Sequence, residues 1–347
     1  MASPGQKGTK TQVAEDNTGL LSSDEIRTGF ITGVTFERKA VQYAAVDGLA
    51  MFEGDICLGT VEEMERRSAA VATAQSDDNV ARGVAITGDQ FRWPNALVPY
   101  DIDSALPNQQ RVGDAIAHWE EQTNIRFVLR TAANAAQYPN YVHVFKGDGC
   151  WSYVGMQTGR QDLSLADGCL RGQAIHEFGH AIGLWHEQSR EDRDSFVAIQ
   201  WANIEAGKES NFNQHISDGD DIGGYDYGSI MHYGRFAFSK NSLPTIVQLQ
   251  GGPTIGQRNG LSAGDIAAVH SIYRTTHHNL TIDQVYATPH SKNAWALFAG
   301  VPGWRRVEPT SADGVTNAFA VLAAARASGR KVHANIDGSL IYAVYGV

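Results

Sequence analysis

Long apolar runs, clusters of basic residues and cysteines are all scarce in this chain of 347 residues. No stretch of eighteen apolar residues occurs, so the sequence predicts no membrane-spanning helix. Its 28 basic residues are outnumbered by 38 acidic ones, and the absence of a Lys/Arg cluster excludes a general nucleic-acid binder. There are only three cysteines, Cys57, Cys150 and Cys169, so at most one intramolecular disulfide forms and one thiol remains.

Hydrophobic residues make up 42% of the chain, which is enough for a large core and excludes wholesale disorder. The length favours two or three domains. We expect residues 1–30 to form a polar, mobile leader and residues 61–85 to form a surface linker. The composition changes after residue 274, which indicates a small separate module over residues 275–347.

Apolar periodicity predicts an α+β fold, because helical and strand patterns alternate along the middle of the chain. Helices are expected over residues 108–122 and 173–185, and strands over residues 125–129 and 141–145. The tail has strand patterns near residues 294–298 and 340–345 and an alanine-rich helical pattern near residues 316–327. Its Trp295, Trp304 and Tyr342 suit either a ligand platform or, more commonly, a core.

The strongest chemical signal is the pentapeptide His176-Glu177-Phe178-Gly179-His180. Side chains four positions apart lie on one face of a helix, so both imidazoles can reach the same metal ion. Glu177 stands beside the first imidazole and can take a proton from water there. The same five-residue pattern also occurs in helices that merely carry two surface histidines. The residues that follow it are therefore needed to distinguish a metal site from such a helix.

Gly183 follows His180 by three residues, and a glycine there can take the left-handed conformation that ends a helix. The turn can bring His186, three residues later, back to the metal as a third ligand. Three neutral imidazoles leave a fourth position for water, which is typical of a catalytic zinc site. The whole string, His-Glu-x-x-His-x-x-Gly-x-x-His, is the metzincin signature and predicts bound Zn²⁺.

With the residues around this motif included, the sequence resembles a known family, the astacin metalloendopeptidases. Residues 176–194 resemble its extended zinc motif, residues 229–233 (Ser-Ile-Met-His-Tyr) its Met-turn, and residues 149–155 its substrate-side edge strand. The similarity runs from about Ile86 to Tyr273. It implies a two-lobed, metzincin-like α+β catalytic domain with a mixed sheet and an active-site helix over residues 84–274. A propeptide over residues 1–83 and a small α+β module over residues 275–347 would flank it.

The resemblance implies a role for each matching residue. It makes His176, His180 and His186 the zinc ligands and Glu177 the general base. Tyr233 would bind zinc in the resting enzyme and stabilise the oxyanion during catalysis, and Met231 would form a hydrophobic floor under the metal. The remaining implied roles are a salt link from Glu187 to the mature N-terminus, a disulfide between Cys150 and Cys169, and a substrate edge strand at Trp151, Ser152 and Tyr153.

Phe52-Glu53-Gly54-Asp55 resembles the family's propeptide switch, in which the aspartate binds zinc and displaces the catalytic water. Cys57 is a second candidate, because zinc readily takes sulfur and an odd cysteine needs a role. Residues two apart in an extended segment point the same way, so geometry alone does not separate them. We favour Asp55 and expect cleavage by an activating protease near Arg82.

The sequence therefore predicts a secreted zinc endopeptidase that acts on protein or peptide substrates and is inhibited by its own propeptide. The alternative is a catalytically silent binding or adhesion protein on the same fold, which the presence of Glu177 and Tyr233 disfavours. A disulfide would imply an oxidising compartment. Residues 1–16 lack the apolar core of a secretory signal, and we expect such a signal to have been removed or replaced.

Overall fold

The computed structural model describes residues 6–32, 39–73, 84–85, 91–214, 221–273, 275–289, 292–307, 312–337 and 340–346. They fall into two compact units, Met1–Val269 and His270–Val347. Among these residues, no helix combines the length and apolar character needed to cross a membrane. The α+β prediction is confirmed.

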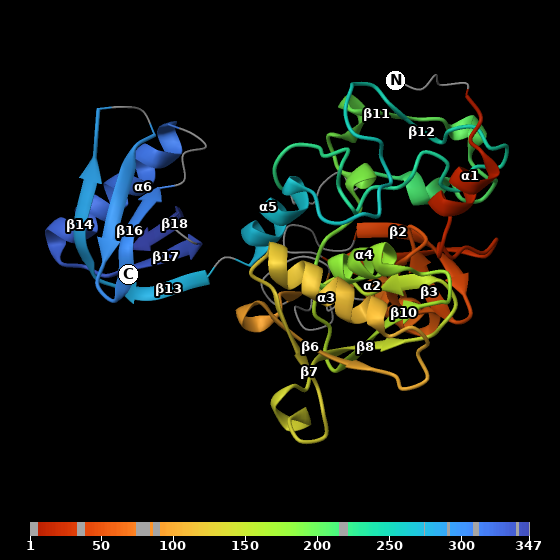
Figure 1. Ribbon diagram of the computed structural model, residues 1–347, viewed down its shortest axis with the longest axis horizontal. Coiled ribbons are helices and arrows are strands. Elements are labelled where there is room, and N and C mark those ends of the chain that lie inside the picture. Colours follow the sequence, from red (N-terminus) through yellow and green to blue (C-terminus); the bar gives the residue numbers. More distant parts are fainter. Residues whose placement is uncertain are drawn as a thin grey trace. The chain divides into compact units, whose positions relative to one another are not determined.

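The larger unit is built on a mixed sheet that has ten strands within the described residues (Figure 1). The order across the sheet is β5-β1-β2-β3-β4-β9-β10-β8-β6-β7. Five of its strands come from the first 85 residues: β1 (Ile26–Thr32), β2 (Lys39–Val46), β3 (Leu49–Phe52), β4 (Ile56–Thr60) and β5 (Val84–Ala85). The others are β6 (Leu97–Ile102), β7 (Arg126–Leu129), β8 (Tyr141–Phe145), β9 (Cys150–Ser152) and β10 (Arg160–Leu165).

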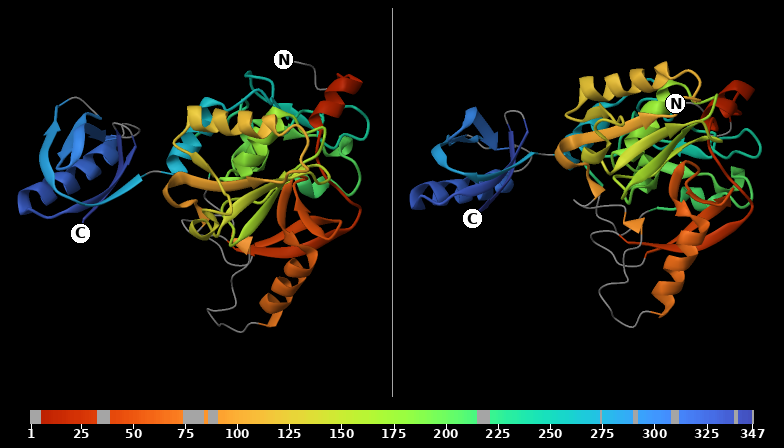
Figure 2. Two further views of the ribbon diagram at one scale, coloured as in Figure 1. Left: turned by 60° about the horizontal axis from the view of Figure 1, so that its bottom comes forward. Right: turned by 90° about the horizontal axis from the view of Figure 1, so that it is seen from below.

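Helices α3 (Gln110–Gln122) and α4 (Arg171–Ala181) pack against each other beside this sheet (Figure 2). On α3, the side chains of Val112, Ile116 and Trp119 are buried, as their helical spacing predicts. The indole of Trp119 donates to the carbonyl of Ile175 at 3.0 Å, which ties α3 to α4. The helix α4 ends at Ala181 rather than at residue 185, because Gly183 has a φ of 111° and turns the chain back.

The expectation of a mobile leader and a surface linker near the N-terminus is wrong for the described residues. Helix α1 (Lys10–Asp16) and strand β1 lie in the supposed leader, and helix α2 (Val61–Thr73) lies in the supposed linker. The side chain of Met64 on α2 is fully buried beside β1 and β4. Polar composition misled the prediction. Helix α2 is fixed by its buried Met64, whereas hydrogen bonds of Asp16 and Asn17 with Phe236 hold the end of α1.

The remainder of the larger unit is mostly irregular and is held by its own apolar cluster around Phe212 and Ile246. Strands β11 (Val197–Ile199) and β12 (Ile246–Gln248) form a two-stranded sheet, and helix α5 covers Ala263–Ile272. Short 3₁₀ turns complete the larger unit: η2 (Pro94–Ala96), η3 (Ala135–Gln137), η4 (Glu187–Ser189), η5 (Arg193–Ser195), η6 (Trp201–Asn203) and η7 (Glu209–Phe212).

The smaller unit is a six-stranded sheet, within the described residues, whose one face is covered by helix α6 (Ala312–Ser328) (Figure 2). Its strand order is β13-β17-β18-β16-β15-β14. The strands are β13 (Thr275–Leu280), β14 (Ile282–Ala287), β15 (Ala294–Phe298), β16 (Val301–Val307), β17 (Val332–Asp337) and β18 (Leu340–Gly346). Phe298, Leu322 and Ile341 belong to the core of this unit. Trp304 is 39% exposed and lies outside that cluster, so the core interpretation fails for this residue.

Candidate metal centre and catalytic site

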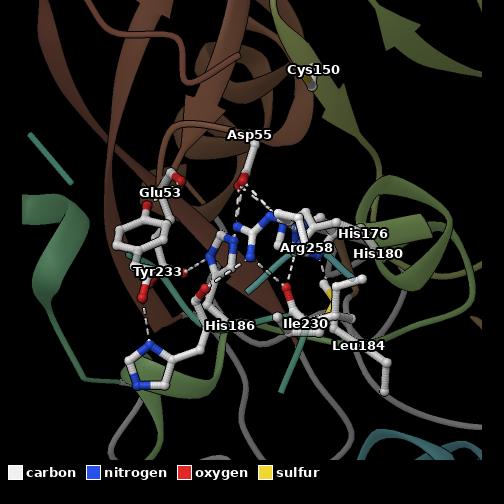
Figure 3. Close-up of polar contacts among 12 residues, drawn as sticks. Glu53, Asp55, Cys150, His176, His180, Leu184, His186, Ile230, Tyr233 and Arg258 are labelled. Carbon is white, nitrogen blue, oxygen red and sulfur yellow. Dashed lines mark hydrogen bonds and ion pairs between the residues drawn. The ribbon is translucent and has the colours of Figure 1, made fainter. Parts of the chain in front are cut away.

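Three buried imidazoles come together at the end of α4 (Figure 3). His176 and His180 project from the same face of the helix, and the turn at Gly183 brings His186 beside them. The ring centroids lie 4.7 Å (His176–His180), 5.4 Å (His176–His186) and 4.8 Å (His180–His186) apart. The spacing of the histidines in the sequence therefore translates into a single cluster.

The outer ring nitrogen of each imidazole has a hydrogen-bond partner. His176 Nδ1 lies 2.8 Å from the carbonyl of Ile230, and His180 Nδ1 lies 2.8 Å from the carbonyl of Leu184. A carbonyl only accepts, so both Nδ1 atoms carry the proton and both Nε2 atoms are free to bind a metal. His186 Nδ1 differs, because its partner at 2.7 Å is the carboxylate of Glu53.

Asp55 reaches into the cluster from the turn between β3 and β4. Its Oδ2 lies 3.2 Å from His176 Nε2, and its Oδ1 lies 3.1 Å from His186 Nε2. One ligand atom from Asp55 and from each histidine lie within 4.8 Å of one another. Asp55 Oδ1 is buried, and its contact with His186 Nε2 lacks the geometry of a hydrogen bond. Three imidazoles and a carboxylate are a donor set that zinc accepts, so the residues fit a Zn²⁺ ion.

Burial and the neighbouring carboxylates shift the pKa values of the cluster in different directions. Burial lowers the pKa of His176 to about 3 and also lowers the pKa of His180, which keeps both imidazoles neutral. Burial opposes the charged form of His186, yet the carboxylates of Asp55 and Glu53 raise its pKa to about 9. Burial likewise opposes the charged form of Asp55, but His186 and the other two imidazoles hold its pKa well below the usual value.

Glu177 is buried next to the three imidazoles. Burial, and then the negative charge of Asp55, raise its pKa well above the usual value. Its Oε2 has no hydrogen-bond partner among the described residues, and its side chain lines a cavity together with Asp55, Tyr233 and Arg258. A carboxylate held in this way is suited to exchange protons with a water in the cavity.

Tyr233 and Met231 both lie close to the histidine cluster. The ring of Tyr233 lies 4.8 Å from that of His186, and its hydroxyl donates to the backbone carbonyl of Glu53. Met231 is buried against α4 at Gly179, where a Cβ in place of the glycine hydrogen would come within 2.6 Å of its sulfur. The methionine therefore packs directly beneath the helix that carries the first two histidines.

Glu187 is mostly buried one residue after the third histidine. Its Oε1 accepts a hydrogen bond from Asp226 N at 2.7 Å and lies 3.6 Å from Arg190 Nε. Burial, the largest effect, raises its pKa to about 8. The side chain is thus a buried acid that could receive a cationic partner.

Strand β9, which includes Trp151 and Ser152 and is followed by Tyr153, is not at an edge. It pairs with β10 on one side and with β4 on the other. Ser152 N donates to the carbonyl of Asp55 at 3.0 Å, and Cys150 N donates to the carbonyl of Gly19 at 3.0 Å. The N-terminal segment therefore occupies the main-chain groups that an added peptide strand would need.

The three cysteines have different surroundings. Cys150 and Cys169 form a disulfide with an S–S distance of 2.08 Å, which is the pairing that the resemblance implies. Cys57 is a buried free thiol whose Sγ lies 3.7 Å from the carbonyl of Gly59, and it is not in the ligand group. Burial raises the pKa of Cys57 to about 12, which disfavours the thiolate that zinc binds. Arg82, the expected cleavage position, lies outside the described residues.

The roles of Glu53 and Arg258 in this site were not predicted from the sequence. Glu53 occupies the variable position of the Phe-x-Gly-Asp motif, and only its place next to Asp55 could have drawn attention to it. Arg258 is half-buried and donates from Nη1 to the carbonyls of Ile230 and His232 at 2.9 and 3.1 Å. A single arginine far along the chain carries no signal of such a position.

A family model described as Astacin, a peptidase family, matches residues 85–274, more than half of the chain. The chain is 38% identical to zinc metalloproteinase nas-15 of Caenorhabditis elegans over 235 residues, which are 64% of this chain and 39% of that protein. It is 38% identical to blastula protease 10 of Paracentrotus lividus over 64% of this chain and 38% of that protein.

Human meprin A subunit beta is 37% identical, over 65% of this chain and 30% of that protein. The chain thus spans less than half the length of these relatives. Among solved structures, high choriolytic enzyme 1, a hatching enzyme zinc-protease from Oryzias latipes, is 37% identical with a TM-score of 0.48. That match covers 52% of this chain and 92% of the other.

Proposed function

Since the chain belongs to the astacin family of peptidases, we propose that it is a zinc-dependent endopeptidase held latent by its own residues 1–83. The observation that carries this proposal is Asp55 among the three histidines. A carboxylate from the first 83 residues lies where the open ligand position of a catalytic zinc site would be. Removal of that carboxylate would open the position to water.

His176, His180 and His186 would hold the zinc ion, which when bound polarises a peptide carbonyl and makes water more acidic. The chain's own residues carry the proton transfers. In its ionised form Glu177 takes a proton from the attacking water and then delivers it to the leaving amine. Tyr233, once its hydroxyl is released from the Glu53 carbonyl, donates a hydrogen bond to the developing oxyanion.

The substrate would lie extended along β9, with Trp151, Ser152 and Tyr153 beside it. In the latent chain β4 pairs with this strand at Ile56 and Ser152. Once β4 leaves, the main-chain groups of β9 become available to an added peptide strand. Recognition through main-chain hydrogen bonds favours broad action on protein and peptide substrates.

The segment over residues 1–83 would be the inhibitory propeptide and residues 84–274 the protease domain, with an activating protease cutting near Arg82. After cleavage, the new N-terminal ammonium would pair with the buried carboxylate of Glu187. Residues 275–347 would form an accessory module. The Cys150–Cys169 disulfide supports an oxidising compartment and hence secretion.

Casein digestion by the processed chain tests this function. The zinc-loaded processed protein should cleave casein, lose that activity to a chelator and regain it when zinc is added back. Processed Glu177→Gln protein is the matched control, because its ligands are intact and its base is missing. A zinc-loaded, correctly processed chain that leaves casein and a peptide library uncut would overturn the proposal.

A further inference from the structure

Glu53 lies beside the ligand group without belonging to it (Figure 3). Its Oε2 is 2.7 Å from His186 Nδ1, and its Oε1 accepts a hydrogen bond from Ser189 Oγ at 2.6 Å. Its backbone carbonyl accepts from the hydroxyl of Tyr233. We propose that Glu53 is a positioning residue that holds the third imidazole for zinc and locks Tyr233 in the latent chain. The inference rests on the zinc site of the proposed function.

The three histidines differ in where their outer partners come from. Those of His176 and His180 are the backbone carbonyls of Ile230 and Leu184, both within residues 84–274. His186 receives its partner from residues 1–83. A carboxylate at Nδ1 fixes the tautomer of a metal-binding imidazole and makes the ligand more basic. The third ligand is therefore completed by a segment that the active enzyme would lack.

The backbone around Glu53 is held in an unusual conformation. Glu53 has a φ of 47°, a left-handed value that is uncommon for a residue with a side chain, and Gly54 follows with a φ of 78°. The carbonyl of Gly54 accepts a hydrogen bond from Leu21 N at 2.7 Å, and the ring of Phe52 meets that of Trp185 edge to face. Such a conformation persists where the surroundings determine it. Here it directs the carboxylate of Glu53 to His186 and that of Asp55 to all three histidines.

Loss of residues 1–83 would therefore change two things together. It would remove Asp55 from the ligand group. It would also remove Glu53, which is a hydrogen-bond partner of His186, Ser189 and Tyr233. The latent chain would accordingly retain zinc more firmly than the contribution of Asp55 alone explains. Release of the Tyr233 hydroxyl would be coupled to the same event.

The test compares zinc loss from the full-length chain and its Glu53→Gln variant, as the rate of transfer to excess chelator. Partners of metal ligands commonly contribute ten- to hundredfold to metal affinity, so the variant should lose zinc at least about tenfold faster. With Co²⁺ in place of zinc, its visible absorption should shift, because the imidazole at the metal is held differently. Glu65→Gln on α2, which removes an exposed carboxylate paired with Arg27, should match the wild type.

Two further variants separate this role from its alternatives. Ser189→Ala removes a partner of Glu53 without touching His186, and should accelerate zinc loss by a smaller factor. If Glu53 acts on His186 directly, Glu53→Gln should still accelerate zinc loss in an Asp55→Asn background. If Glu53 merely positions Asp55, the Glu53→Gln substitution will not accelerate zinc loss further in that background, and the proposal is then wrong.

Zinc retention within twofold of the wild type, with an unchanged Co²⁺ spectrum, would also overturn the role of Glu53. That result would leave the proposed function intact. A wild-type chain that binds no zinc would instead refute the proposed function itself. Should Glu53→Gln fail to fold, the Ser189→Ala variant carries the same prediction, and wild-type retention in that variant would count against it.

Discussion

The backbone carbonyl of Asp55 accepts a hydrogen bond from Ser152 N at 3.0 Å, while the side chain of the same residue reaches the three histidines. A single residue thus joins the N-terminal segment both to the strand where a substrate would bind and to the site where zinc would bind. Blocking of the strand and blocking of the metal are consequently one structural event. Under the proposed function, latency and its release would both follow from the docking of this segment.

The first prediction concerns the general base. In processed protein, Glu177→Gln should keep one zinc per chain and lose at least about 100-fold in kcat, because the ligands remain while proton transfer does not. Metal analysis and peptide cleavage on the same preparation check this. Turnover comparable with the wild type would rule out Glu177 as the base.

The second prediction separates the two candidates for the switch. Asp55→Ala should show activity without processing or activate itself faster, since the carboxylate in the ligand group is gone. Cys57→Ser should remain latent, because the thiol lies outside that group. The measurement is peptide cleavage by unprocessed protein. The reverse pattern, with sensitivity of latency to thiol reagents, would identify a cysteine switch.

The third prediction uses Asp16, whose carboxylate accepts a hydrogen bond from Phe236 N at 2.8 Å. Burial, partly offset by that bond and by Arg258, raises its pKa from 3.8 to about 6. Between these values the folded chain holds a proton that the unfolded chain has lost, so the contribution of Asp16 to stability falls as pH rises from 4 to 6.

Asp16→Asn should therefore gain stability relative to the wild type over this pH range, by at most about 3 kcal/mol. Denaturant unfolding of both full-length proteins at pH 4, 5, 6 and 7 measures the difference. A difference that stays constant across the range, or that changes in favour of the wild type, would show that Asp16 is not protonated in the folded chain.

The fourth prediction concerns the disulfide, which closes a loop with a sequence separation of 19 residues. Replacing both Cys150 and Cys169 by serine should lower the free energy of unfolding by about 3 kcal/mol, because the unfolded chain regains loop entropy. Cys57→Ser is a control for loss of a buried thiol outside the disulfide. The same unfolding midpoint under reducing and non-reducing conditions in the wild type would contradict this expectation.

The sequence predicted well those parts of the molecule in which local pattern and tertiary structure agree. The spacing of His176, His180, Gly183 and His186 requires only the periodicity of a helix and one left-handed turn, so the cluster could be expected from the residues alone. The strand over residues 141–145 is likewise found at the predicted positions. In each case a short-range rule is sufficient.

Prediction failed where a contact joins distant parts of the chain. Strands β1 to β4 and helix α2 gain their order from a sheet that β9 completes much later in the chain, and no local pattern encodes that pairing. Glu53 was missed for the same reason, because its partners His186 and Ser189 lie more than 130 positions away. The choice between Asp55 and Cys57 also depended on which side chain faces the histidines.

The most direct test of the account is to follow processing and activity in one time course. Zinc-loaded full-length protein is treated with a trace of an activating protease, while N-terminal sequencing and peptide cleavage are recorded together. We predict no cleavage at the start, and activity that rises in step with a new N-terminus between residues 82 and 84. Full activity before processing, or a zinc-loaded processed chain without activity, would contradict latency through residues 1–83.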